Sequence, residues 1–283
     1  MMNTNKMNRP QFEEKRARLI QYLRSLEKVA VAFSGGIDST LMLKIAHDVL
    51  GTQAVGITAV SPSVARAELE EARELARQIG AKHLEVKSNE MEDPGYRENT
   101  PNRCYYCKTN SYEEIITAAA EMGIPNILDG TNADDADDFR PGRKAAKEKG
   151  VLSPFQMFGI TKEEIRQWAR EAKLPNWNKP AAACLSSRIP YGTPVSEVNL
   201  KMVEEAEQFL KSMGIRQVRV RHYDLLARIE VEPSDFDKLI EHRQQIVERF
   251  KEIGYHYATM DLRGFRSGSM NEIINEEKWK QQN

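Results

Sequence analysis

Short apolar runs alternate with amphipathic stretches in the first part of the chain. Short runs typical of strands occur at 29–33, 54–59, 83–86, 126–129 and 151–155; those at 29–33 and 54–59 are almost wholly small or apolar, and those at 83–86 and 126–129 are half apolar. Between them, apolar side chains spaced three or four residues apart predict helices over 11–27, from about Asp38 onward, and over 65–79, 109–122 and 161–172. This alternation is typical of an α/β fold with a parallel sheet and helices on both faces.

The pattern changes near residue 185. The stretch LPNWNKPAAACLSSRIPY, from Leu174 to Tyr191, contains too many prolines and small residues for regular structure. Beyond it the pattern predicts helices over 196–213 and 234–253, and strands over 217–222, 226–231 and 257–261. We therefore predict two domains, an α/β domain over residues 1–185 and a smaller α+β domain over 186–283.

The first predicted strand runs directly into a glycine-containing loop and then a helix. Gly35 and Gly36 allow backbone N–H groups to approach an anion closely, and the hydroxyls of Ser34, Ser39 and Thr40 add donors. The positive end of the following helix points at the same spot. Neither the lysine of a Walker loop nor the three spaced glycines of a dinucleotide fingerprint is present. We predict a phosphate-binding loop; the alternative is an ordinary strand-to-helix turn.

The segment SGGIDST resembles the pyrophosphate-binding loop (PP-loop) of the N-type ATP pyrophosphatases, which split ATP between its α and β phosphates and adenylate a substrate. The resemblance implies a Rossmann-like sheet, ATP and Mg²⁺ as cofactors, and Asp38 as a magnesium-binding residue. It also implies that the loop after the fourth strand faces the nucleotide, through Gly130, Asn132 and Asp135. The acidic run of that loop is also typical of a solvated turn.

Composition narrows the possible partners. A formal net charge of -1 argues against nucleic acid as the main partner and favours a small molecule. The N-terminus is polar, and no run approaches the roughly 20 apolar residues of a membrane helix, so we expect no membrane and a cytoplasmic protein. Three cysteines argue against a disulfide framework and in favour of metal or thiol chemistry.

Two of these cysteines, Cys104 and Cys107, form a CxxC motif in a predicted polar loop over residues 88–108, and Cys184 stands alone. The spacing suits chelation of one metal ion at a loop-to-helix junction. Spacing alone leaves a zinc site, a redox pair, an iron-sulfur cluster and two structural thiols open.

Several longer segments carry a narrower resemblance. Together with SGGIDST and the DG…FRPG segment (Asp129–Gly142), the segments NWNKPAAACLSSRIPYG, VRVRHYDLLARIE and LRGFRSGSMN resemble the LarE family of sulfur transferases, over nearly the whole chain. This implies that ATP adenylates the carboxylates of pyridinium-3,5-biscarboxylic acid mononucleotide, which become thiocarboxylates for the nickel-pincer cofactor of lactate racemase. It also implies a homo-oligomer in which the second domain binds substrate.

The cysteines distinguish two branches of that family. One branch gives up the sulfur of a single cysteine, which lies in the stretch that here runs from Ala181 to Leu185. The CxxC motif departs from that branch and resembles thiolases that hold a 4Fe-4S cluster on three thiolates, with a hydrosulfide on the open iron. The implied ligands are Cys104, Cys107 and Cys184, and the implied co-substrate is sulfide or another sulfur donor.

Arginines in the second domain are candidates for binding the substrate phosphate. Arg219 and Arg221 share one face of a predicted strand, which by itself is typical of a solvated face. The resemblance implies instead a phosphate site that includes Arg266, a role that suits the guanidinium fork. Ser187 and Arg188, beside Cys184, are implied pocket residues.

Glu207 and Glu230 match acidic positions of the family that hold a second metal, although the pattern around Glu207 also suits an exposed helix charge.

Three other functions are alternatives to sulfur transfer onto the mononucleotide. A tRNA thiolase shares the loop and the cysteines but needs a basic face. An amide-forming ligase of the NAD synthetase kind has no need of three cysteines. A nucleotide-binding module with structural zinc would leave ATP intact.

Overall fold

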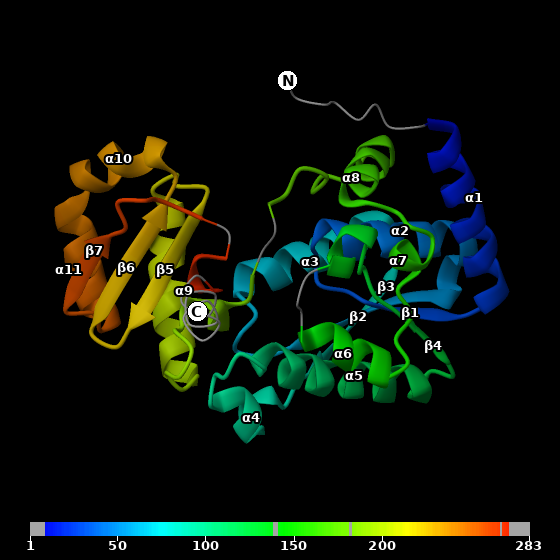
Figure 1. The fold of residues 1–283 in the computed structure, drawn as a ribbon, viewed down its shortest axis with the longest axis horizontal. Helices are drawn as coiled ribbons and strands as arrows, with labels where there is room; N and C mark the ends of the chain where they lie inside the picture. The colour runs from blue at the N-terminus through cyan, green and yellow to red at the C-terminus, as the bar shows by residue number, and fades with distance from the viewer. Residues whose placement is uncertain (1–8, 138–140, 181–182, 267, 272–283) are drawn as a thin grey trace, which may run out of the picture. The chain divides into compact units, whose positions relative to one another are not determined.

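The computed structural model describes residues 9–137, 141–180, 183–266 and 268–271 (Figure 1). Contacts divide the chain into two compact units. Unit one is built from the described residues of Met1–Ser61, Arg66–Glu90 and Cys104–Ala182, and unit two from those of Pro62–Ala65, Met91–Arg103 and Ala183–Asn283. Phe139 and Arg140 of the FRPG segment, and Ala181 and Ala182 beside the lone cysteine, lie outside the described residues.

The described residues of unit one form a four-stranded sheet in the order β3-β2-β1-β4. Its strands are β1 (Val29–Ala32), β2 (Ala54–Val60), β3 (Lys82–Lys87) and β4 (Asn126–Leu128). All neighbouring strands are parallel, and Val29 of β1 lies level with both Ala54 and Asn126. The predicted α/β fold with a parallel sheet is confirmed, and its carboxyl edge is the place where such sheets bind ligands.

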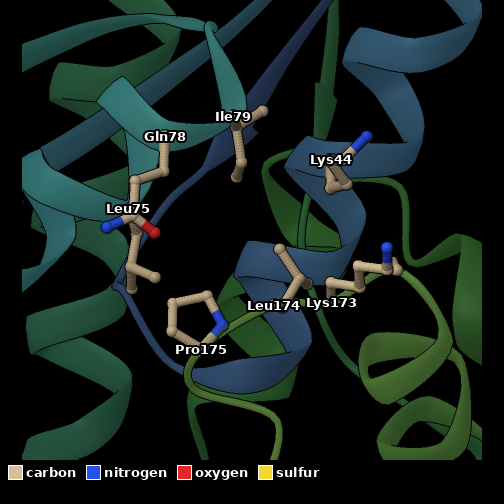
Figure 2. A pocket seen from close by; sticks show the side chains of 8 residues that line it. Lys44, Leu75, Gln78, Ile79, Lys173, Leu174 and Pro175 are labelled. Carbon is tan, nitrogen blue, oxygen red and sulfur yellow. The ribbon is translucent and has the colours of Figure 1, made fainter.

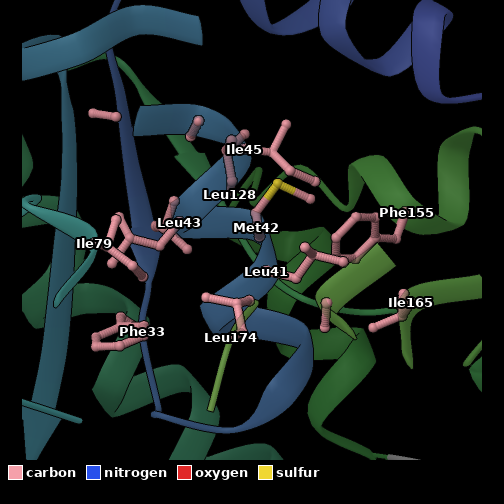
Figure 3. Close-up of a cluster of buried hydrophobic side chains, with 14 of the residues drawn as sticks. Phe33, Leu41, Met42, Leu43, Ile45, Ile79, Leu128, Phe155, Ile165 and Leu174 are labelled. Atoms are coloured by element: carbon pink, nitrogen blue, oxygen red, sulfur yellow. The ribbon is translucent and has the colours of Figure 1, made fainter. Parts of the chain in front are cut away.

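Helices cover both faces of this sheet (Figure 1). They are α1 (Arg9–Leu26), α2 (Ile37–Leu50), α3 (Arg66–Ile79), α5 (Arg103–Glu121), α6 (Pro141–Glu148), α7 (Pro154–Met157) and α8 (Lys162–Glu171), with 3-10 turns η1 (Gly51–Gln53), η2 (Glu90–Glu92) and η3 (Ala133–Asp137). One core packs α1, α2, α3 and α8 against β1, and Figure 3 shows its centre around Leu41 and Leu43 of α2. A second core packs α5 and α6 on the other face.

Two predictions in unit one were wrong. Residues 151–155 do not form a fifth strand: Leu152 makes a single bridge to Leu128, and α7 begins at Pro154. Proline has no N–H for a sheet ladder and suits the first turn of a helix. The 88–108 stretch, which spans both units, is not one loop either, because it contains α4 (Pro94–Arg97) and the start of α5, which carries both Cys104 and Cys107.

Unit two is a small α+β fold, as predicted. Its sheet has the order β5-β6-β7, with β5 (Val218–Tyr223) antiparallel and β7 (Tyr257–Met260) parallel to β6 (Leu226–Val231). The helices are α9 (Glu197–Ser212), α10 (Phe236–Glu241) and α11 (Arg243–Ile253), with 3-10 turns η4 (Leu185–Arg188), η5 (Pro233–Asp235) and η6 (Ser269–Asn271). The predicted helix over 234–253 is broken at His242, which ends α10 and precedes α11.

Within the residues that the structure describes, every helix is too short or too polar to span a membrane.

Candidate functional site

The loop between β1 and α2 has the geometry of an anion site. Gly35 adopts a φ of 70°, a conformation that side chains other than glycine's rarely take. Gly36 is the N-cap of α2 and, among the described residues, no side chain caps this helix end. The backbone N–H groups of the first turn therefore remain available to a ligand at the positive end of the helix. Ser39 stiffens the loop, since its Oγ accepts from the N–H of Ser34 at 3.2 Å and donates to the Gly36 carbonyl at 3.1 Å.

Three side chains from distant segments meet beside this loop. Asp38, in the first turn of α2, forms an ion pair with Lys162 at 2.5 Å between Oδ2 and Nζ. Asn132 donates from Nδ2 to the other carboxylate oxygen of Asp38 at 3.5 Å. Both partners of the ion pair are partly exposed, at 26% for Asp38 and 31% for Lys162, so solvent and ligands can reach them.

Gly130 allows the loop after β4 to lie close to the first turn of α2. A Cβ at this position would lie 2.8 Å from the backbone nitrogen of Ser39 and 2.9 Å from the carbonyl carbon of Asp38. Only a glycine fits there without a backbone shift. The structure therefore brings the predicted residues Asp38, Gly130 and Asn132 together.

Lys162 was missed from the sequence. It is the first residue of α8, after a capping box formed by Thr161 and Glu164, and its backbone N–H donates to Asp134 at 2.8 Å. A lysine in the first turn of a helix is unfavourable for the helix dipole, and this is the one local signal of another role.

These residues suit ATP and Mg²⁺. The α2 amides, the Ser34 hydroxyl and the Lys162 ammonium are donors for phosphate oxygens, whereas the Ser39 hydroxyl is already used within the loop; Asp38 offers the carboxylate oxygen that Mg²⁺ prefers. Thr40, the other predicted phosphate residue, lies fully buried, and its hydroxyl oxygen accepts from Asn176 at 3.0 Å.

An exposed lysine, Lys108, lies next to the CxxC motif in unit one. The Lys108 ammonium lies 5.3 Å from the centroid of the Tyr112 ring. The Tyr112 hydroxyl donates to Asp129 at 3.2 Å, and Asp129 directly precedes Gly130. A positive charge therefore lies between the CxxC helix and the end of β4.

The three cysteines, all within the described residues, form no disulfide. Cys104 and Cys184 are exposed and Cys107 is half-buried. Cys104 and Cys107 belong to unit one and Cys184 to unit two. In the described part of the chain, no group of three or more His, Cys, Asp or Glu side chains has the geometry to hold a single metal ion.

Within unit two, hydrogen bonds join the segment before Cys104 to the segment after Cys184. Asn99, fully buried with a φ of 54°, donates from Nδ2 to the carbonyls of Pro190 and Thr193, both at 2.8 Å. Arg103 donates to the side chain of Asn99 and, at 2.8 Å, to the carbonyl of Ser186. These bonds explain why residues 91–103 belong to unit two.

Arg188 is locked into a buried ion pair. Its Nε and Nη2 donate to the two carboxylate oxygens of Glu207 at 2.8 and 3.0 Å, and both side chains are 4% exposed. The same guanidinium donates to the carbonyl of Cys184 at 2.9 Å. Burial acts to raise the pKa of Glu207, but Arg188 outweighs it and the pKa is lowered. Glu207 is thus no exposed helix charge.

Two further guanidinium groups, those of Arg219 and Arg221, lie close to Arg188. Burial, followed by the charges of Arg188 and Arg221, lowers the pKa of Arg219 to about 10. Arg221 donates to Glu230 at 2.7 Å and to Ser269 at 2.8 Å. Repulsion among these positive charges favours the binding of an anion beside them.

The remaining predicted substrate residues, Ser187 and Arg266, make hydrogen bonds within unit two. Ser187 donates from its hydroxyl to the Cys184 carbonyl at 2.8 Å, and its own carbonyl accepts from Arg221 at 2.9 Å. Arg266 donates to the carbonyl of Gly264 at 3.0 Å, and the neighbouring Phe265 ring lies 5.4 Å from the Arg219 guanidinium.

Comparison with known proteins agrees with this geometry. Residues 19–126, which include the loop, match the family model described as asparagine synthase. The chain is 39% identical over 261 residues to pyridinium-3,5-bisthiocarboxylic acid mononucleotide synthase of Lactiplantibacillus plantarum, covering 92% of this chain and 95% of that protein. The chain belongs to the LarE family.

Other relatives fit this assignment. An uncharacterized protein of Synechocystis sp. is 43% identical over 264 residues, covering 93% of this chain and 98% of its own. Argininosuccinate synthase of Methanocaldococcus jannaschii is 25% identical over 165 residues, covering 53% of this chain and 42% of that enzyme. The resemblance read from the motifs is confirmed, and this LarE-family chain is an enzyme that uses ATP through its PP-loop.

Proposed function

We propose that this LarE-family enzyme converts pyridinium-3,5-biscarboxylic acid mononucleotide into its bisthiocarboxylic acid form. The observation that carries the proposal is the PP-loop site, with Asp38 and Lys162 paired beside the uncapped α2, in a chain related along its length to a synthase of that product. The substrate is then a small mononucleotide rather than a nucleic acid.

The first step is adenylation. ATP phosphates accept hydrogen bonds from the loop, and Lys162 exchanges Asp38 for a phosphate oxygen, which leaves Asp38 for Mg²⁺. A carboxylate oxygen of the substrate then attacks the α phosphorus, the bond between the α phosphorus and the bridging oxygen breaks, and pyrophosphate leaves with the electron pair. Lys162 and Mg²⁺ offset the charge that develops on pyrophosphate.

In the second step, sulfur replaces AMP. A sulfide nucleophile attacks the acyl carbon, the bond to the phosphate oxygen breaks, and AMP leaves with the electron pair. Each product molecule therefore requires two ATP molecules, one for each carboxylate.

The phosphate of the mononucleotide has a matching site in unit two. Arg219 and Arg221 share one face of β5, and Arg188, whose own donors are taken by Glu207 and by backbone carbonyls, adds its charge beside them. Their forks suit the oxygens of a phosphate monoester. Arg266 and Ser187 are assigned to the rim of this site, and the proposed role of residues 186–283 is to bind substrate and form an oligomer.

The sulfide source is the 4Fe-4S cluster on Cys104, Cys107 and Cys184. Thiolates are the usual ligands of such clusters, and the chain offers three thiols without disulfides. Cys104, Cys107 and Cys184 would hold the cluster, which would supply the sulfide and spare the cysteines from being consumed.

One experiment tests the reaction. Protein kept without oxygen is mixed with ATP, Mg²⁺, sulfide and the biscarboxylic mononucleotide, and pyrophosphate and the product mass are followed. We expect pyrophosphate release that depends on the mononucleotide, with oxygen replaced by sulfur at both carboxylates. Pyrophosphate release that depends on tRNA instead would favour the thiolase, and intact ATP would favour the binding module.

A further inference from the structure

Asn176 lies against the PP-loop, in the segment that follows α8. This segment is held firmly on both sides. Leu174 is buried in the core around α2, as Figure 3 shows. Leu174 and Pro175 also line a hollow of about 180 Å³ between α2 and α3 (Figure 2), which is too small for a nucleotide. We therefore interpret the hollow as a gap left by side-chain packing and not as a nucleotide site. The next side chain, that of Asn176, faces the PP-loop.

Asn176 makes two hydrogen bonds to the loop and the start of α2. Its Nδ2 donates to the carbonyl of Gly35 at 3.1 Å and to Oγ1 of Thr40 at 3.0 Å. The side-chain orientation follows from the Gly35 contact, since a carbonyl oxygen accepts only from the NH₂ end of the amide. Asn176 is 4% exposed, and its Oδ1 is buried without a partner among the described residues.

An unsatisfied buried acceptor is unfavourable for the folded state. An apolar side chain would fill this position without that cost. The polar residue is therefore explained by what its NH₂ group holds, and the group that it holds is the backbone of the phosphate loop.

The bond to Gly35 decides which way the next amide points. In a trans peptide the C=O and N–H groups point in opposite directions. Because Asn176 holds the Gly35 carbonyl on its own side, the N–H of Gly36 points to the opposite side, where it donates to Ser34 Oγ at 3.4 Å. Two adjacent glycines place little steric barrier to rotation of this peptide, so its direction depends on contacts with Ser34 and Ser39 inside the loop and with Asn176 outside it.

We propose that Asn176 is a positioning residue for ATP, which keeps the peptide between Gly35 and Gly36 turned so that its N–H faces the phosphates. The proposal rests on use of ATP by this loop. It assigns a role in nucleotide binding to a residue 141 positions away from Gly35 in the chain.

The test compares Asn176→Ala and Asn176→Asp with matched variants of Asn126. Asn126 also donates to two backbone carbonyls, those of Leu26 at 3.1 Å and Lys28 at 3.2 Å, but lies at the opposite end of the strands. We expect Asn176→Ala to raise the KM for ATP roughly tenfold, the effect of one lost hydrogen bond, with a smaller change in kcat. Asn176→Asp should raise the KM for ATP further, because its carboxylate would repel the carbonyl oxygen of Gly35.

The second readout is the rise in melting temperature on adding ATP, which needs no mononucleotide. The shift should shrink in both Asn176 variants and stay at the wild-type size in Asn126→Ala, even where the two alanine variants lose equal stability without ATP. Wild-type KM and a wild-type shift in Asn176→Ala would overturn the proposal, as would equal losses in Asn126→Ala. Failure of the wild type to release pyrophosphate would instead count against the proposed function, and the ATP shift would still report on Asn176.

Discussion

Lys162 pairs with Asp38 across 124 positions of the chain, at 2.5 Å between ammonium and carboxylate. One partner begins α8 and the other lies in the first turn of α2, so packing of these two helices sets the distance. The pair places a cation and a candidate magnesium ligand at the same end of the PP-loop.

Lys162→Met should lower the rate of pyrophosphate release by roughly 100-fold or more, since a fixed donor for developing charge is lost in the transition state. Steady-state pyrophosphate assays measure this. Lys44→Met is the control, because Lys44 also forms an ion pair at 2.5 Å, with Asp48 on the exposed face of α2. Comparable losses in the two variants would refute a role for Lys162 in the reaction.

Gly130→Ala should weaken ATP binding by pushing the loop after β4 away from Ser39, whose backbone nitrogen would lie 2.8 Å from the new Cβ. The KM for ATP reports the effect. Gly123→Ala separates backbone strain from crowding, because Gly123 has a φ of 67° and no described atom lies within 4 Å of its added Cβ. The account is contradicted if Gly130→Ala keeps the wild-type KM.

Glu207→Ala should destabilise the protein by about 3–5 kcal/mol, because it leaves the buried Arg188 guanidinium without its carboxylate. Urea unfolding measures the change. Glu252→Ala removes one partner of an exposed pair with Arg249 and should cost only about 0–1 kcal/mol. Equal effects would show that burial of the Arg188–Glu207 pair has no energetic consequence.

Stability should fall as the pH drops below about 6.5. Burial lowers the pKa of His83, and the same cause lowers that of His222. Below the unfolded pKa the unfolded chain binds protons that the folded chain does not, so unfolding is favoured until the folded pKa values are reached. Urea midpoints at about pH 7.5 and about pH 5.5 test this. His83→Gln should shrink the difference, whereas the exposed His256→Gln should not, and an unchanged difference in His83→Gln would exclude His83 as a source.

Local pattern was sufficient for the main elements of the fold. Apolar runs located β1 and β2 because most residues of these strands are buried, and the loop motif located Asp38 because its chemistry is carried by adjacent residues. The pattern failed at Pro154, where an apolar run is too short to tell a strand from a helix turn.

Contacts between residues far apart in the sequence could not be predicted from the local sequence pattern. Lys162 and Asn176 reach the loop only through the packing of α8 and the segment after it, which no local pattern encodes. Glu207 is a different case, since its position seven residues after Leu200 and four after Val203 places it on the buried face of α9. Helical spacing therefore predicts that Glu207 is buried, whereas the charge of its side chain suggested an exposed position.

The most direct test of the account counts thiocarboxylates formed per protein chain. Anaerobic protein is supplied with ATP, Mg²⁺, sulfide and excess biscarboxylic mononucleotide, and both the product and the intact protein are weighed by mass spectrometry. The account predicts more than one sulfur transferred per chain, an unchanged protein mass, and loss of turnover together with bound iron in Cys104→Ala. A reaction that stops at one sulfur per chain, with the protein lighter by the sulfur of Cys184, would contradict it.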